Sequence, residues 1–378
     1  MHRHRAKASF MTSSSVPPGS PGAATPEARL DALTSWAAGV LGSSDFTIAP
    51  ASSDASFRRY FRIVPATPWR GRSSLIAMDA PPPMEDCRPF VHVSKLMRDA
   101  EVNAPEIFAS DLTRGFLLLS DLGTTMYLSA LDERSARALY LDALDALVRW
   151  QAATRDGELP PYDEALLARE LELFPDWYVA RHLGKTLTDA QRAVLGQTFR
   201  TVLDNNLAQP RVYVHRDYHS RNLMLCEERA AADSAASTGS AARRDNPGVL
   251  DFQDAVIGPV TYDLVSLLRD AYVAWDEEIQ IDFAVRYWER ARAAKLPVDS
   301  DFSVLWRDFE WMGVQRQLKV LGIFARLYHR DGKAQYLADM PRVMTYLRGA
   351  CERYNAFTPL LRLLDELEGV TPQVAYTF

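Results

Sequence analysis

The sequence has 378 residues, of which 47% are hydrophobic and 24% charged, which is typical of a globular protein with one large or two modest domains. The net charge of −6 argues against nucleic acid or a strongly anionic membrane surface as a main partner. No stretch approaches the ~20 apolar residues of a membrane span, and the three cysteines contain no C-x-x-C pair, so a disulfide framework or zinc site is disfavoured and a reducing, cytoplasmic compartment is expected.

Residues 1–25 are expected to form a disordered tail. They begin with basic residues and continue with Ser, Pro, Gly and Ala, without the apolar stretch of a signal peptide. Thr25 then provides an N-cap and Pro26 a first helical residue, and the helix that they begin is expected to stop at Gly42.

Short segments of strand character follow, interrupted by one helix around Phe90. The three segments with this character are Phe57–Val64, Leu75–Ala80 and Phe116–Leu119. Residues 26–122 therefore predict a small antiparallel β-sheet lobe.

Residues 123–378 are mostly of helical pattern, with short apolar strands at 211–214, 223–226 and 248–250. The low-complexity stretch 227–247 lacks periodicity and is expected to be a disordered insertion in a hairpin. A small sheet lobe, a hinge and a large helical lobe predict an α+β, two-lobe fold of the protein-kinase-like type.

The strongest chemical signal is the loop from Val214 to Asn222, which reads V-H-R-D-Y-H-S-R-N between two apolar strands. Phosphoryl transfer needs a carboxylate to orient and deprotonate the attacking hydroxyl, and ligands for the magnesium ions that neutralise the phosphates. Asp217 has the position of the base and Asn222 that of a metal ligand. A polar turn with a capping Asp is the alternative interpretation of a single Asp, but it does not explain the whole pattern.

Two further carboxylates follow in the order that a kinase needs. Asp251 ends an apolar strand and would bridge magnesium to the phosphates, opposite Asn222. Asp263, in G-P-V-T-Y-D-L, would either cap the helix that begins there or hold the backbone of the catalytic loop.

Together, H-R-D-x-x-x-x-N, D-F-Q-D and G-P-x-x-Y-D-L resemble the aminoglycoside-phosphotransferase branch of the protein-kinase-like fold. Longer stretches, such as residues 53–62 and 77–82, resemble the subgroup that phosphorylates the anomeric hydroxyl of N-acetylmuramate and N-acetylglucosamine in cell-wall recycling. The resemblance implies ATP and Mg²⁺ as cofactors, an amino-sugar substrate and a sugar 1-phosphate product. We expect a monomer, although the sequence does not settle the oligomeric state.

The resemblance also places the nucleotide. Residues 117–123 look like the family's hinge, where the carbonyl of Ser120 and the amide of Leu122 would meet the adenine edge. The phosphate-covering loop lacks glycines, but small residues such as Ser53 can still offer backbone amides to phosphate. Asp79 replaces the usual third-strand lysine, and Arg58 is the favoured substitute cation.

Four more side chains lie in the catalytic loop or in the D-F-Q-D motif. His219 or Arg221 would supply the cation that protein kinases place near the transferred phosphate, and Arg221 is preferred because it stays charged. His215 is expected to pack in the loop's base. Asp254 would contact the acceptor or cap a turn.

Two competing functions stay open from the residues alone. A kinase for a cationic antibiotic would use a cluster of acids, and residues 155–177 contain seven, although Glu170 and Glu172 cannot share a helix face. A nucleotide-binding pseudokinase would explain the missing lysine and glycines, but has no need to keep the base and both metal ligands.

Overall fold

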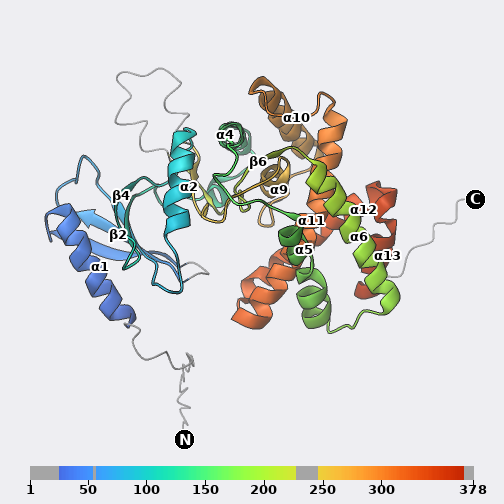
Figure 1. Ribbon diagram of the computed structural model, residues 1–378, viewed down its shortest axis with the longest axis horizontal. Coiled ribbons are helices and arrows are strands. Elements are labelled where there is room, and N and C mark those ends of the chain that lie inside the picture. Colours follow the sequence, from blue (N-terminus) through green and yellow to red (C-terminus); the bar gives the residue numbers. More distant parts are fainter. Residues whose placement is uncertain (1–24, 54–56, 227–245, 370–378) are drawn as a thin grey trace, which may run out of the picture. The chain divides into compact units, whose positions relative to one another are not determined.

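The computed structural model describes residues 25–53, 57–226 and 246–369. The chain forms two compact units (Figure 1). The first comprises the described residues up to Glu85 together with Ala109–Leu118, and the second comprises Asp86–Phe108 and the described residues from Leu119 onward. Residues 1–24 of the tail predicted over 1–25, and residues 227–245 of the insertion predicted over 227–247, lie outside the described residues.

The first unit is built on one helix and a five-stranded sheet with the order β1-β2-β3-β5-β4, in which β1–β2 and β2–β3 are antiparallel pairs. The elements are α1 (Pro26–Leu41), β1 (Phe46–Ser53), β2 (Arg59–Pro65), β3 (Leu75–Asp79), β4 (Ile107–Asp111) and β5 (Phe116–Ser120).

The first helix begins and ends as the sequence predicts. Thr25 Oγ1 accepts a hydrogen bond from the Ala28 amide, Pro26 is the first helical residue, and Gly42 ends the helix with φ 71°. Gly115, in the β4–β5 turn, has φ 76°, and an added Cβ would lie 1.9 Å from the Ala80 carbonyl oxygen. Only glycine therefore allows this turn to approach the end of β3.

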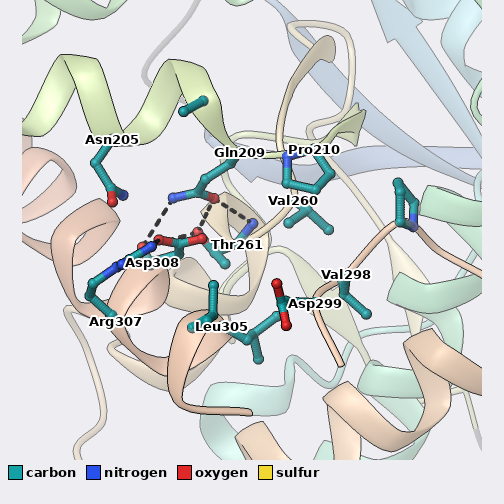
Figure 2. A pocket seen from close by; sticks show the side chains of 13 residues that line it. Asn205, Gln209, Pro210, Val260, Thr261, Val298, Asp299, Leu305, Arg307 and Asp308 are labelled. Carbon is teal, nitrogen blue, oxygen red and sulfur yellow. Dashed lines mark hydrogen bonds and ion pairs between the residues drawn. The ribbon is translucent and has the colours of Figure 1, made fainter. Parts of the chain in front are cut away.

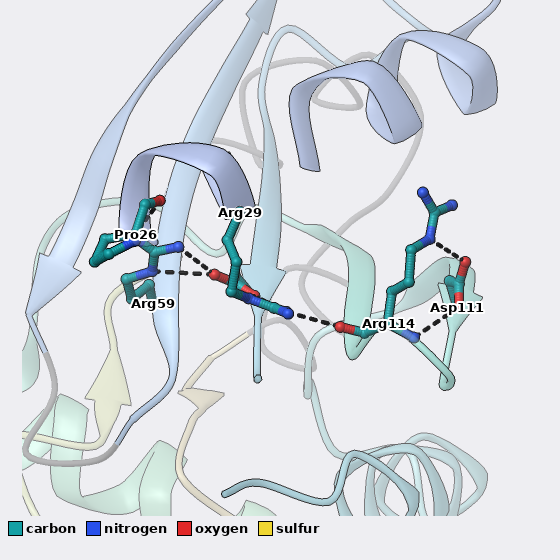
Figure 3. A network of polar contacts seen from close by, with 6 residues as sticks. Pro26, Arg29, Arg59, Asp111 and Arg114 are labelled. Atoms are coloured by element: carbon teal, nitrogen blue, oxygen red, sulfur yellow. Dashed lines mark hydrogen bonds and ion pairs between the residues drawn. The ribbon is translucent and has the colours of Figure 1, made fainter. Parts of the chain in front are cut away.

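Asp79, which stands where kinases carry their third-strand lysine, is fully buried and accepts from two arginines (Figure 3). Arg29 Nε donates to Oδ1 at 2.9 Å and Arg59 Nε donates to Oδ2 at 3.0 Å. Arg59 is also the cross-strand partner of Asp79, and it donates to the Pro26 carbonyl at 3.0 Å. This network fastens α1 to the sheet, so Asp79 has a structural role.

The second unit is mainly helical, with two small antiparallel pairs, β6–β9 and β7–β8. Its strands are β6 (Arg211–Val214), β7 (Leu223–Met224), β8 (Gly248–Val249) and β9 (Val256–Pro259). Its α-helices are α2 (Arg88–Asp99), α3 (Tyr127–Ala130), α4 (Ala136–Ala152), α5 (Glu164–Leu171), α6 (Asp189–Ala208), α9 (Tyr262–Leu268), α10 (Glu277–Ala293), α11 (Phe302–Asp331), α12 (Met340–Arg353) and α13 (Thr358–Glu368). A π-helix, Phe174–His182, and two 3₁₀ turns, Ala334–Asp339 and Asn355–Phe357, complete it.

The long helix α11 is the central element of this unit, and α6, α9, α12 and the π-helix pack against it (Figure 1). Sixteen of its residues are buried, and they include charged side chains such as Glu310, Arg316 and Lys319. Among the described residues, no helix is long and apolar enough to cross a membrane. The predicted α+β fold, with a small antiparallel sheet and a mostly helical remainder, is confirmed.

Candidate active site

The loop between β6 and β7 is held in place by Asp263 of α9. One carboxylate oxygen of Asp263 accepts from the His215 amide at 2.7 Å, and the other accepts from the Arg216 amide at 3.0 Å. Thr261, the residue before α9, makes no side-chain cap, and Asp263 lies in the first turn of the helix. Of the two roles expected from the sequence, the structure therefore shows the loop-holding one. Burial raises the pKa of Asp263 to about 6, although the nearby His215 and the two amides favour its charged form.

His215 links this loop to the strand that precedes Asp251. Its Nδ1 accepts from the Asp217 amide at 3.2 Å, so the ring proton lies on Nε2, which donates to the Leu250 carbonyl at 2.9 Å. Burial lowers the pKa of His215, and the ring is neutral at physiological pH. His215 is thus a packing and positioning residue, as the sequence predicts.

The structure brings Asp217, Asn222 and Asp251 together. Asn222 Nδ2 donates to the Asp217 carbonyl oxygen at 2.9 Å and lies 3.4 Å from Asp251 Oδ2. This leaves the Oδ1 oxygen of Asn222 for a cation beside the Asp251 carboxylate. The described residues hold no group of three or more His, Cys, Asp or Glu that could bind a metal. One amide and one carboxylate nonetheless fit Mg²⁺, which takes few protein ligands and completes its shell with phosphates and water.

Two residues of the site have a backbone conformation that non-glycine residues rarely adopt. Arg216, before the candidate base, has φ 79°, and Asp251, the candidate metal ligand, has φ 61°. Such strain persists where surrounding contacts fix it, and it is often found at functional sites. Here the Asp263 clamp holds Arg216, and Gln253 Nε2 donates to Asp251 Oδ1 at 2.9 Å.

A buried ion cluster lies behind the loop. Glu170 of α5 pairs with Arg216 and with Lys319, whose Nζ lies 2.9 Å from Glu170 Oε1 and donates to the Tyr262 hydroxyl at 2.9 Å. Burial alone would raise the pKa of Asp217, but the charge of Lys319, aided by that of Arg316, holds it below its usual value. Asp217 is therefore ionised at neutral pH, as a general base must be.

His219 and Arg221, the two candidate catalytic cations, lie against one aromatic residue. The Arg221 guanidinium is 3.7 Å from the centre of the Tyr272 ring, and His219 meets the same ring edge-on at 5.4 Å. Burial lowers the pKa of His219, so its ring is neutral near pH 7. Of the two, Arg221 is the permanent cation.

The other candidate residues are spread over both units. Asp254 is exposed and lies three residues after Asp251. Ser120 is buried, with its amide donating to the Glu106 carbonyl at 2.8 Å, and Leu122 packs against the β7–β8 pair, where a Cβ on Gly248 would lie 3.0 Å from Leu122 Cδ1. In the first unit, Ser53 ends β1, and Arg58 Nε lies 3.5 Å from Glu85 Oε2.

A cavity of about 300 Å³ lies elsewhere in the second unit and contains none of the candidate catalytic residues (Figure 2). Gln209, one of its lining residues, accepts from the Thr261 hydroxyl at 2.7 Å and donates to the Asp308 carbonyl at 3.1 Å. Trp306 and Trp311 pack among other rings, Trp306 against Phe309 and Trp311 against Phe357, both at 5.0 Å between centres.

Lys319, Arg316 and Tyr272 are the site neighbours that sequence reasoning missed. They lie far along the chain from the catalytic loop and belong to no short motif. The sequence does contain a pattern that could have indicated Arg316 and Lys319. These cations are three residues apart on one face of α11, among residues that are otherwise mostly apolar and buried.

Comparison with known proteins agrees with this geometry. Residues 47–298 match the model of the phosphotransferase enzyme family. The chain belongs to this family. It is 48% identical to the N-acetylmuramate/N-acetylglucosamine kinase of Neisseria meningitidis serogroup B over 341 residues, which is 89% of this chain and 95% of the relative. It is 50% identical over 329 residues to the enzyme of the same name from Pseudomonas aeruginosa, with 87% and 89% covered.

Solved structures show that this phosphotransferase has a kinase-like fold. A choline kinase from Streptococcus pneumoniae matches with a TM-score of 0.57 at 9% identity, covering 85% of this chain and 99% of the other. A gentamicin complex of an aminoglycoside phosphotransferase matches with a TM-score of 0.52 at 12% identity, covering 86% and 97%. The predicted two-lobe, protein-kinase-like fold and the family resemblance are confirmed.

Proposed function

We propose that this phosphotransferase transfers the γ-phosphate of ATP to the anomeric hydroxyl of N-acetylmuramate or N-acetylglucosamine, giving the sugar 1-phosphate in the cytoplasm. The observation that carries the proposal is the ionised Asp217 beside the Asn222–Asp251 pair, on a loop fixed by Asp263. The acceptor identity rests on the relatives, which carry that name at 48% and 50% identity.

In the proposed reaction Asp217 accepts the proton of the anomeric hydroxyl. The oxygen then forms a bond to the γ-phosphorus as the bond to the β–γ bridging oxygen breaks, and ADP leaves with that electron pair. Because its pKa is low, Asp217 is ionised and can accept a hydrogen bond that orients the anomeric hydroxyl. It takes the proton only as the transition state is reached. Arg221 would offset the charge on the transferred phosphate, with His219 as its neutral neighbour.

Separate residues are assigned to the metal, the adenine and the phosphates. Asn222 and Asp251 would bind Mg²⁺, which when present neutralises the phosphates and orients them. Backbone atoms of Ser120 and Leu122 would hold the adenine, and the amide of Ser53 and the Arg58 side chain the phosphates. Arg59, like Arg29, is already paired with the buried Asp79 carboxylate. We therefore assign the contact with the phosphates to the neighbouring Arg58.

The geometry of the acids favours a sugar over a cationic antibiotic. Glu170, the central acid of the segment 155–177, is buried and paired with Arg216 and Lys319, whereas Glu172 is exposed. Glu170 is thus not available to bind a cationic aminoglycoside. We assign Asp254, which is exposed beside the metal ligand, to a hydrogen bond with the sugar acceptor.

A coupled assay of ADP release with a panel of acceptors tests the proposal. Turnover with N-acetylmuramate and N-acetylglucosamine, but not with kanamycin- or gentamicin-class amino sugars, is expected. Turnover with the antibiotics alone would place the chain in the resistance branch of the family. Tight nucleotide binding without any turnover would identify a pseudokinase.

A further inference from the structure

Arg316 is a buried cation with hydrogen-bond donors that no described residue satisfies. Its side chain is on α11 and the residue is 3% exposed, with Nη2 donating to the Ser266 hydroxyl at 2.8 Å. Its Nε and Nη1 have no hydrogen-bond partner, and no carboxylate in the described ranges lies within ion-pair distance of it. Buried N–H donors without a partner are costly, so an oxygen-bearing ligand is expected to accept from them.

The position of Arg316 relates it to the reaction. It contacts Ser266 of α9, the helix that also carries Asp263, and its charge acts on Asp217 and on Tyr272, the ring against which Arg221 lies. Lys319, one turn further along α11, also acts on Asp217, but it is already paired with Glu170. Of these two α11 cations, Arg316 alone is left for a ligand.

A second orphaned polar atom lies at the same place. His219 Nδ1 is buried and has no partner, and its ring packs edge-on against Tyr272. Two buried polar side chains with unmet hydrogen bonds, both beside the base, indicate a polar ligand that satisfies them when it binds.

We propose that Arg316 binds the carboxylate of the acceptor and so favours N-acetylmuramate over N-acetylglucosamine. The two sugars differ by a lactyl ether, and that group carries the one negative charge that distinguishes them. An arginine is suited to this because its charge is permanent and its planar N–H groups match a carboxylate. The inference rests on the proposed function, because it assigns a part of the acceptor to a residue.

Kinetics with both sugars separate this role from its alternatives. In Arg316→Met, kcat/KM for N-acetylmuramate is expected to fall at least ~30-fold, while kcat/KM for N-acetylglucosamine changes less than ~3-fold, because a site built for a polar group rejects analogues that lack it. Equal losses for both sugars would overturn the proposal and would point to the transferred phosphate or to the loop. Arg326→Met, the same change ten residues further along α11, is the matched control and should leave kcat/KM unchanged for both sugars.

The wild-type enzyme provides a test that does not depend on folding of a variant. The methyl ester of N-acetylmuramate lacks the charge, so with the wild-type enzyme its kcat/KM should be at least ~30-fold below that of the free acid, as for Arg316→Met with the free acid. Arg316→Met should no longer distinguish the acid from its ester. An ester as good as the acid in the wild type would overturn the inference alone, whereas a wild type that phosphorylates neither sugar would overturn the proposed function.

Discussion

The carboxylate of Asp263 accepts both the His215 and the Arg216 amides, at 2.7 and 3.0 Å, and so fixes the backbone just before the candidate base. Arg216 has φ 79° there, a conformation that the chain would not keep without such a hold. The position of Asp217 thus depends on a residue that touches no substrate.

Asp263→Asn should therefore lower kcat at least ~10-fold with little change in the affinity for nucleotide. The substituted amide can accept only one of the two hydrogen bonds and brings an N–H group against the other amide, which costs about 1–3 kcal/mol. Steady-state kinetics and denaturant unfolding measure the two effects. An Asp263→Asn enzyme with wild-type kcat would contradict the role of the clamp.

The same residue predicts a pH dependence. Burial raises the pKa of Asp263 from its usual 3.8 to about 6, so its contribution to stability is fully present below about 4 and is lost as pH rises through about 6. Activity should change in the opposite direction, because protonation removes an acceptor oxygen from the clamp as pH falls through about 6. A pH profile of kcat and of unfolding should show this opposition, and an acid limb that persists unchanged in Asp263→Asn would assign it to another group.

Asp217→Asn tests the base. We expect kcat to fall ~10³-fold or more while the Kd for nucleotide stays within about 3-fold, because the amide cannot accept the proton but keeps the shape. Single-turnover kinetics and calorimetry with a nonhydrolysable nucleotide separate the two. Asp254→Asn is the matched control, and its loss should be confined to the KM for the acceptor.

Asp251→Asn tests the metal ligand. Removing the carboxylate should raise the Mg²⁺ concentration needed for half-maximal activity at least ~10-fold, because Asn222 alone supplies only a neutral oxygen. A magnesium titration at saturating nucleotide measures this shift. An unchanged magnesium requirement would exclude Asp251 from the metal site.

The third-strand position gives a contrast with other kinases. Asp79→Lys should not improve nucleotide binding, and it should destabilise the protein by about 3–5 kcal/mol, because Arg29 and Arg59 would lose their buried partner and face a third cation. Thermal unfolding and nucleotide titration check the two parts. Arg58→Ala, by comparison, should weaken nucleotide binding ~10-fold or more, and Arg62→Ala should not.

Helix ends and strands that are determined by residues close together in the sequence could be predicted. Thr25, Pro26 and Gly42 bound α1 as predicted, and the strand at 211–214 was predicted with its bounds. Three strands, β1, β4 and β9, were not predicted. Pro50 in β1 and Pro259 in β9 are unusual in strands, and β4 is only half-buried. The motif residues Asp217, Asn222 and Asp251 could be predicted to meet because phosphoryl transfer requires them together.

The residues that could not be predicted act from a distance along the chain. Glu170 forms an ion pair with Lys319, which is far away in the sequence. Asp79 likewise forms an ion pair with Arg29 of α1. No spacing rule links such residues, since only tertiary packing brings them together. The sequence-based domain boundary at residue 122 stays a prediction, as do the roles of the individual site residues.

Phosphorus NMR of the product tests the central claim most directly. N-acetylmuramate or N-acetylglucosamine incubated with enzyme, ATP and Mg²⁺ should give one new phosphomonoester resonance that couples to the anomeric proton, and Asp217→Asn should form it at least ~10³-fold more slowly. A resonance coupled to the C6 protons, or none while ATP is consumed with another acceptor, would contradict the assignment of the anomeric hydroxyl as the phosphate acceptor.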